Sequence, residues 1–338
     1  MAILVSGGAG YIGSHTCIEL MKAGYEIIVA DNLVNSSKES LRRVEKISGK
    51  AVPFVNVDLC NPHGADELFK AHPEIDSVIH FAALKAVGES VAKPLEYYTN
   101  NLVNTLTVLN TMRRYGVKNF VFSSSATVYG DPASVPITED FPLSTTNPYG
   151  TTKLFIERIL TDYCAADPTM NVALLRYFNP IGAHESGLIG EDPNGIPNNL
   201  VPYIAKVAVG KLEKVHVYGN DYSTPDGTGV RDYIHVVDLA RGHVAALKKL
   251  ATNCGLFVCN LGTGHGYSVL DVIKAYGEAC GKELPYVIDP RRPGDIAECW
   301  ADPKKAREEL GWEAQYDIDD MCATSWKWQS TNPNGYKG

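Results

Sequence analysis

Tyr149 and Lys153 have the chemistry and the spacing expected of a proton-transfer pair. They lie in Asn147-Pro148-Tyr149-Gly150-Thr151-Thr152-Lys153, where Asn147 is a candidate N-cap and Pro148 suits the first helical position. Helical spacing then puts both side chains on one face. A phenol must lose roughly three pKa units, or about 4 kcal/mol, to act as a base near neutrality. A lysine ammonium at roughly 4 to 5 Å contributes about 3 to 4 kcal/mol, and the positive ring of an oxidised nicotinamide would supply the rest.

The pair alone is weak evidence, because tyrosine and lysine occur at this spacing on many surface helices. A second motif strengthens it: Ser123-Ser124-Ser125-Ala126-Thr127 follows a predicted strand at residues 119–122. The carboxyl ends of parallel strands are where ligands bind in this type of sheet. Serine also favours turns, which explains the run but not its placement. A serine at this edge can hydrogen-bond a reacting oxygen and relay its proton to Tyr149.

A glycine-rich turn predicts a dinucleotide site. Gly7-Gly8-Ala9-Gly10-Tyr11-Ile12-Gly13 directly follows a predicted strand at residues 3–6 and opens an amphipathic segment. Glycines at these positions allow a tight turn, close approach of a pyrophosphate and close packing of the helix. A purely structural turn is the alternative, but the strand before it and the helix after it favour nucleotide binding.

Asp31 ends the second predicted strand, where a carboxylate can accept hydrogen bonds from both hydroxyls of the adenosine ribose. This favours NAD over NADP, since a 2'-phosphate would meet a negative charge. Lys38, Arg42 and Arg43 lie downstream and could bind such a phosphate, although a solvated helix face explains them more simply. Asp58 ends the third predicted strand and is placed to meet the adenine amino group, with turn capping as the alternative.

The elements that position these residues form an α/β pattern. Strands are predicted at residues 3–6, 27–30, 52–57, 77–80, 119–122 and 172–177, with helical segments between them. This alternation predicts a doubly wound parallel sheet of the Rossmann type. Glycine and proline crowd the chain after Phe178, which indicates a junction. We therefore predict an NAD-binding domain at 1–178, which segments near 236–262 are candidates to rejoin, and a smaller C-terminal α/β substrate subdomain at 179–338.

Composition limits the classes of function. The 338 residues include 31 basic and 39 acidic side chains, a formal charge of -8, so no general attraction to nucleic acid or an anionic membrane is expected. The eight cysteines form no Cys-x-x-Cys pair and no zinc-type cluster, so we predict reduced thiols and no metal site. The N-terminal apolar run is too short for a signal peptide, and no stretch approaches membrane-spanning length. These features predict a cytoplasmic protein.

Together these motifs resemble the extended short-chain dehydrogenase/reductase superfamily. Nearly the whole chain is similar to the UDP-glucose 4-epimerase family, notably at residues 84–90, 174–180, 196–200, 226–235 and 290–295. The resemblance implies that Ser125 and Tyr149 act on the sugar 4-hydroxyl, while Lys153 holds the nicotinamide ribose and lowers the pKa of the tyrosine. Tightly bound NAD would take hydride from C4, the 4-keto sugar would turn its other face, and the returned hydride would interconvert UDP-galactose and UDP-glucose.

The resemblance also implies the residues that contact each ligand. For NAD they are Gly7, Gly10, Tyr11, Ile12, Gly13, Asp31, Asn32, Asn35, Ser36, Asp58, Leu59, Phe81, Ala82, Ala83, Lys85, Asn100, Ser123, Tyr149, Lys153, Tyr177 and Phe178. For the UDP-sugar they are Lys85, Ser125, Tyr149, Phe178, Asn179, Asn199, Leu200, Tyr218, Arg231, Tyr233, Arg292, Asp295 and Cys299.

Three of these positions carry further predictions. Arg231 and Arg292 are planar donors suited to the two phosphates of UDP, although surface salt bridges would also account for either one. Cys299 matches a position that is a bulky tyrosine in some family members. Its small side chain predicts room for the N-acetyl group of UDP-GalNAc and UDP-GlcNAc. The family further implies a homodimer, formed through helices near residues 94–115 and 147–164.

Two other functions compete. A nucleotide-sugar dehydratase of the same fold also oxidises C4, but it needs an added acid and base, commonly Asp-Glu, where this chain has Ala126 and Thr127. A non-catalytic NAD sensor would keep the fold with no reason to keep Ser125, Tyr149 and Lys153 together. Epimerisation is therefore favoured over both.

Overall fold

The computed structural model describes residues 1–292 and 294–337. Of the stretch 290–295, Pro293 lies outside the described residues. In the part of the chain that is described, no helix combines the length and the apolar character needed to cross a membrane.

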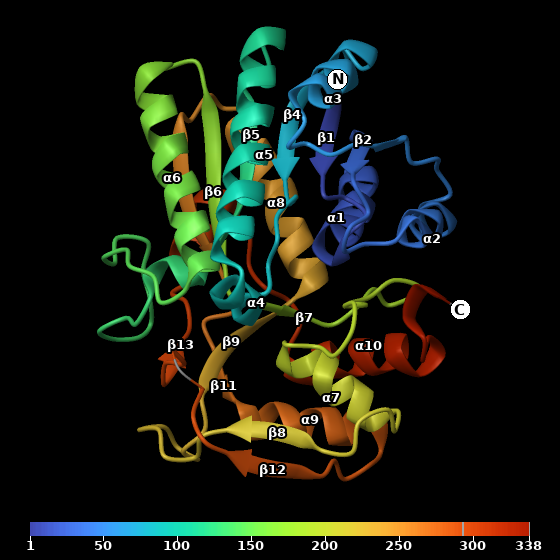
Figure 1. The fold of residues 1–338 in the computed structure, drawn as a ribbon, viewed down its shortest axis with the longest axis vertical. Helices are drawn as coiled ribbons and strands as arrows, with labels where there is room; N and C mark the ends of the chain where they lie inside the picture. The colour runs from blue at the N-terminus through green and yellow to red at the C-terminus, as the bar shows by residue number, and fades with distance from the viewer. Residues whose placement is uncertain (293, 338) are drawn as a thin grey trace.

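A seven-stranded parallel sheet forms the larger part of the molecule, in the order β10-β6-β5-β4-β1-β2-β3. Its strands are β1 (Ala2–Ser6), β2 (Glu26–Asp31), β3 (Phe54–Asn56), β4 (Ile75–His80), β5 (Asn119–Ser125), β6 (Asn171–Tyr177) and β10 (Leu256–Leu261). Because all seven strands are parallel, their carboxyl ends share one edge. In Figure 1 this edge faces the smaller part of the molecule.

Helices cover both faces of the sheet, and alternate residues of each strand supply the two cores. Ile3 and Val5 face a core shared with α1 (Tyr11–Lys22), α2 (Lys38–Ser48) and α8 (Val236–Leu250). Ala2 and Leu4 face a second core shared with α3 (Pro62–Ala71), α5 (Pro94–Tyr115) and α6 (Pro148–Ala166). Strands buried on both faces carry continuous apolar runs, as β1 does. The predicted doubly wound α/β fold is confirmed.

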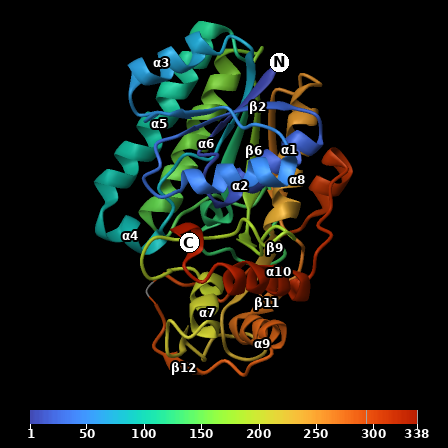
Figure 2. The same ribbon diagram turned by 90° about the vertical axis from the view of Figure 1, so that its right-hand side faces the viewer.

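The smaller part of the molecule contains short strands packed on three helices (Figures 1 and 2). These elements are β7 (Asn179–Ile181), α7 (Leu200–Ala208), β8 (Val215–Tyr218), β9 (Val230–His235), β11 (Gly266–Ser268), α9 (Val269–Cys280), β12 (Tyr286–Asp289), β13 (Glu298–Cys299) and α10 (Ile318–Thr331). β9 lies between β11 and β13 and also pairs with β7, while β8 pairs with β12. One apolar cluster joins α7, α9 and α10 beneath them.

Two observations refine the expected elements. β5 continues through Ser125, so the serine run belongs to the strand instead of following it. The chain also returns to the large sheet after β9, since α8 packs against α1 and β10 pairs in parallel with β6. Ser123, Ser124 and Ser125 at the carboxyl edge of β5 pair with β6, which β10 covers on its other side.

Candidate active site

The glycine turn after β1 leaves no room for side chains. A Cβ on Gly13 would lie 2.4 Å from the Gly7 carbonyl oxygen, and one on Gly7, where φ is +74°, would lie 2.7 Å from the backbone nitrogen of Ala82. Gly10 is the N-cap of α1, and no side chain caps its amides. The first turn of α1 contains no acidic residue. Uncapped amides at the positive end of a helix suit a pyrophosphate, so this turn fits a dinucleotide.

Asp31 is buried at the end of β2, and most of its hydrogen-bonding capacity is already used. Oδ1 accepts from the Leu33 amide (2.9 Å) and the Ser36 hydroxyl (2.8 Å), and Oδ2 accepts from the Ala9 amide (3.1 Å). A carboxylate has about four acceptor positions. One therefore remains for a ribose hydroxyl, and binding both hydroxyls requires Ser36 to turn away.

The other charged residues near the adenosine end are engaged within the protein. Asp58 accepts from the Cys60 amide at 2.9 Å, which is the turn-capping geometry. Arg42 and Arg43 both pair with Glu39 at 2.9 Å. Arg43 also donates to Asn332 at 2.6 Å, so its guanidinium ties α2 to the C-terminal segment. This pairing favours the structural explanation of the two arginines over a phosphate site.

Most remaining residues expected at NAD lie along the same sheet edge. They are Asn32, Asn35 and Ser36 after β2; Leu59 after β3; Phe81, Ala82 and Ala83 after β4; Ser123 in β5; and Tyr177 and Phe178 at the end of β6. Asn100 lies on α5, where its amide donates to Asn101 at 3.0 Å. The topology thus brings residues that are distant in sequence to one edge.

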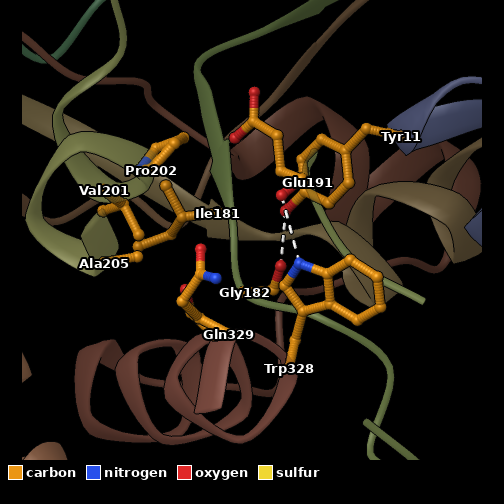
Figure 3. Close-up of a pocket in the computed structure, with 10 residues that line it drawn as sticks. Tyr11, Ile181, Gly182, Glu191, Val201, Pro202, Ala205, Trp328 and Gln329 are labelled. Atoms are coloured by element: carbon orange, nitrogen blue, oxygen red, sulfur yellow. Dashed lines mark hydrogen bonds between the residues drawn. The ribbon is translucent and has the colours of Figure 1, made fainter. Parts of the chain in front are cut away.

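Tyr11 and Lys85 connect this edge to the smaller part of the molecule. The Tyr11 hydroxyl donates to the Gly182 carbonyl at 2.6 Å, beside a small cavity that Trp328 and Glu191 also line (Figure 3). Lys85 pairs with the Glu191 carboxylate at 3.2 Å. The Tyr11 hydroxyl is therefore already hydrogen-bonded within the protein. A ligand can contact the partly exposed Tyr11 side chain only through its ring.

The start of α6 brings the predicted catalytic residues together. The Asn147 side chain accepts from the Gly150 amide at 2.8 Å, which confirms it as the N-cap. The Ser125 side chain lies near the Tyr149 phenol and lowers its pKa. The Lys153 ammonium donates to the Ser123 carbonyl at 2.6 Å. A phenol, an ammonium and a serine hydroxyl therefore converge at the carboxyl edge of β5.

The protein's own groups do not make Tyr149 a base. Burial raises the pKa of Tyr149 to about 12, and the Ser125 side chain opposes the rise. Burial lowers the pKa of Lys153 to about 7, opposed by the charge of Glu157. The Lys153 nitrogen lies 5.8 Å from the centre of the Tyr149 ring. The protein's own groups thus leave the phenol protonated near neutrality, and the charge of oxidised nicotinamide is still expected to supply the remaining lowering of its pKa.

Arg292, expected at the phosphates, lies in a cluster with two residues that the family resemblance places at the uridine end, Tyr218 and Asp295. Its guanidinium is 4.6 Å from the centre of the Tyr218 ring and pairs with Asp295 at 3.0 Å. All three side chains are at least partly exposed, so a ligand can reach them. Arg231 is half-buried on β9, where it donates to the carbonyls of Val230 (2.8 Å) and Ala297 (3.3 Å).

The residues expected along the sugar and phosphate path differ in exposure. Asn179 and Asn199 are exposed, and Asn199 donates to Glu191 at 3.3 Å. Leu200 begins α7. Tyr233, which the family resemblance places at the uridine end instead, is buried in the apolar cluster with α7 and α9. Phe178 and Cys299 are buried together in another cluster with Ala126, Val128, Tyr129, Ile137 and Ala301.

Sequence reasoning missed three residues that support the predicted catalytic group, one by direct contact and two as an ion pair beside it. Ser90 accepts from the Tyr149 amide at 3.1 Å. Glu157, one turn beyond Lys153, forms a buried ion pair with Arg176 of β6 at 2.6 Å. A signal was available, because a charged residue within the apolar strand Val-Ala-Leu-Leu-Arg-Tyr requires a buried partner.

Comparisons with known proteins show the family to which the chain belongs. The family model described as GDP-mannose 4,6 dehydratase matches residues 4–325. The chain is 64% identical to a UDP-glucose 4-epimerase of Bacillus subtilis over 337 residues, covering 100% of this chain and 99% of the relative. It is 61% identical to a UDP-glucose 4-epimerase of Dictyostelium discoideum, covering 99% and 97%. The crystal structure of UDP-glucose 4-epimerase from Bifidobacterium longum in complex with NAD+ and UDP is 60% identical and superposes with a TM-score of 0.95, covering 99% and 100%.

Proposed function

Because the chain belongs to the UDP-glucose 4-epimerase family, we propose that it is an NAD-dependent isomerase that interconverts UDP-galactose and UDP-glucose. The observation that carries the proposal is the convergence of Tyr149, Lys153 and Ser125 at the carboxyl edge of β5. The adjacent glycine turn and Asp31 fit the pyrophosphate and ribose of NAD. Proton transfer and a redox cofactor are thus available at one site.

In this proposal, Ser125 hydrogen-bonds the sugar 4-hydroxyl and Tyr149 takes its proton. Bound NAD supplies reversible oxidation at C4. Lys153 keeps a positive charge near the phenol and has Nζ donors for the nicotinamide ribose. Since Tyr149 has a pKa of about 12 from the protein's groups, its basicity depends on the charge of oxidised NAD. Deprotonation of the sugar is thereby coupled to the presence of the oxidant.

The alternative function is that of a dehydratase, because the family model that matches the chain is described as GDP-mannose 4,6 dehydratase. Elimination of water from the sugar needs an acid and a base beside the catalytic serine. Ala126 has neither, and Thr127 offers only a hydroxyl, which does not ionise near neutrality. Dehydration is therefore not favoured, and the catalytic set Ser125, Tyr149 and Lys153 does not favour a non-catalytic NAD sensor.

The nucleotide end of the substrate is assigned to Arg292, Tyr218, Asp295 and Arg231, with the residues named above along the path to the sugar. Arg292 and Arg231 provide planar donors for the two phosphates, and Tyr218 provides a ring for the uracil. Holding the nucleotide firmly leaves the sugar less constrained. A keto sugar that must present both faces to NAD requires such freedom.

Cys299 sets the space next to the sugar in this proposal, so UDP-GalNAc and UDP-GlcNAc are also substrates. Its support is the burial of the small thiol beside Phe178. The test compares catalytic efficiency on UDP-galactose and UDP-GalNAc for wild type and Cys299→Tyr. We expect a selective loss on the N-acetyl sugar; equal losses on both would reject the assignment.

The proposed assembly is a homodimer, and the proposed compartment is the cytoplasm. Val103 and Leu106 of α5 and Phe155 of α6 expose 38%, 41% and 47% of their surfaces, which is typical of a face covered by a second copy. All eight cysteines are free thiols, as in a reducing compartment.

One experiment tests the main proposal. The purified protein is incubated separately with UDP-galactose and UDP-GalNAc without added NAD, and the products are identified by chromatography and NMR. Epimers are expected, with NAD recovered from the denatured protein. A product that has lost water would instead establish a dehydratase. Unchanged substrate would favour the non-catalytic NAD sensor.

A further inference from the structure

One face of α6 makes three polar contacts with consecutive residues at the end of β5. The pairs are Tyr149 with Ser125, Lys153 with the Ser123 carbonyl (2.6 Å) and Glu157 with the Ser124 hydroxyl (2.5 Å). The three α6 residues are spaced by four, so they lie on successive turns. Tyr149 and Lys153 have roles in the proposed reaction. Glu157 has no role in that reaction, although it is hydrogen-bonded to the same strand.

Arg176 fixes Glu157 as a buried carboxylate. The guanidinium of Arg176 contacts both carboxylate oxygens, at 2.9 Å and 2.6 Å, and the two side chains are only 5% and 4% exposed. Arg176 is the register partner of Ser124 on the neighbouring strand, and it also donates to the Tyr129 hydroxyl at 3.0 Å. Two guanidinium donors and the Ser124 hydroxyl therefore satisfy the Glu157 carboxylate as the negative partner of a buried ion pair.

Lys153 needs a nearby negative charge, because it is 3% exposed and burial disfavours its ammonium form. The titratable groups that face it are Glu157 and Tyr149 of α6 and His80 of β4. Burial lowers the pKa of His80 to about 3, so the imidazole is neutral, and the Tyr149 phenol carries a proton at neutral pH. Glu157 is the group among them that brings a negative charge.

We propose that Glu157 is a positioning residue for the Tyr149 and Lys153 pair. Its carboxylate, fixed by Arg176, favours the ammonium form of Lys153 and holds the end of β5 against α6. The meaning of this role for catalysis rests on the proposed function. The charge on Lys153 itself can be measured without any turnover.

The direct test follows the ionisation of Lys153 in nucleotide-free protein. Lysine labelled with carbon-13 at Cε gives an NMR signal for each lysine side chain. The signal that is missing from the spectrum of Lys153→Arg is that of Lys153. In Glu157→Gln the titration midpoint of Lys153 should fall by about one pH unit or more. Glu157→Asp keeps the charge and should restore the midpoint to within a few tenths of a unit of wild type. Equal midpoints in wild type and Glu157→Gln would overturn the proposal.

The pH dependence of turnover gives a second measurement. The basic limb of the kcat profile should move to lower pH in Glu157→Gln and return in Glu157→Asp. Asp162→Asn is the matched control, since it makes the same change on an exposed turn of α6 and should alter neither the profile nor the rate. A lower kcat with an unmoved profile would mean that Glu157 only supports the fold, which also overturns the proposal.

The remaining outcomes are separable. If Glu157→Gln does not fold because Arg176 is left unpaired, Glu157→Gln/Arg176→Gln removes both charges, and its Lys153 midpoint must still lie below that of wild type. If wild type epimerises no UDP-sugar, the proposed function fails, while the NMR midpoints still decide the role of Glu157.

Discussion

Substituting Gly13 by alanine tests whether close packing of α1 builds the NAD site. The added Cβ would lie 2.4 Å from the Gly7 carbonyl oxygen and 2.7 Å from the Gly8 Cα. Ordinary contacts between such atoms lie near 3.5 Å, so α1 and the turn must separate by about 1 Å. All the nearest atoms belong to the backbone, so no side-chain rotation can relieve the contact. A displacement of this size weakens a positioned interaction by about a hundredfold.

The expected result is therefore a loss of NAD affinity of about two orders of magnitude, with the free energy of unfolding lowered by about 1 to 3 kcal/mol. Calorimetry on nucleotide-free protein measures the NAD affinity, and urea unfolding measures the free energy of unfolding. Gly88→Ala is the matched control, because a Cβ there meets no atom within 4 Å and its φ is ordinary. If Gly13→Ala binds NAD with wild-type affinity, the close approach of α1 is not what forms the site, and the reasoning is wrong.

Three further predictions follow from other parts of the structure. Tyr149→Phe should lower kcat about a thousandfold without loss of bound NAD, as measured by product assays and nucleotide content; retained activity would remove the phenol from the mechanism. Lys153 has a pKa of about 7 in the folded protein and an ordinary value of 10.5, so between these values the unfolded chain binds more protons and stability rises with pH. Relative to Lys153→Met, nucleotide-free wild type should gain up to about 1.4 kcal/mol per pH unit in urea unfolding at pH 7 to 9, and parallel curves would contradict the assigned pKa. Leu106→Glu should halve the molecular mass measured by light scattering, whereas an unchanged mass would exclude α5 from the dimer interface.

Long periodic segments could be predicted closely from the sequence. The apolar periodicity predicts helices near residues 236–250 and 269–280, and α8 and α9 occupy these residues. Strand β9 could not be found in this way, since Arg231 and Asp232 interrupt any apolar run. Asp232 is fully buried and accepts from the Thr263 and Ala301 amides at 2.8 Å and 3.2 Å. Those partners are distant in sequence and are brought close only by the fold.

The same distinction applies to the candidate site. Tyr149 and Lys153 share a face through local helical geometry, so their spacing alone predicts their proximity. The pairing of Glu157 with Arg176 depends on β6 lying next to β5, which the order of the strands in the sequence does not fix. The sequence likewise could not show that burial pushes the pKa of Tyr149 up, because that depends on what covers the ring.

The place of β10 in the large sheet constrains how this protein can be made. β10 is the edge strand that covers β6, yet it is synthesised about 80 residues later, after β7, α7, β8 and β9 of the smaller part. A nascent chain that ends before Leu261 presents the apolar strand Asn171–Tyr177 with one side unpaired. The large sheet therefore cannot be completed until the first strands and helix of the smaller part have been made, and a fragment cut at residue 178 should aggregate instead of binding NAD.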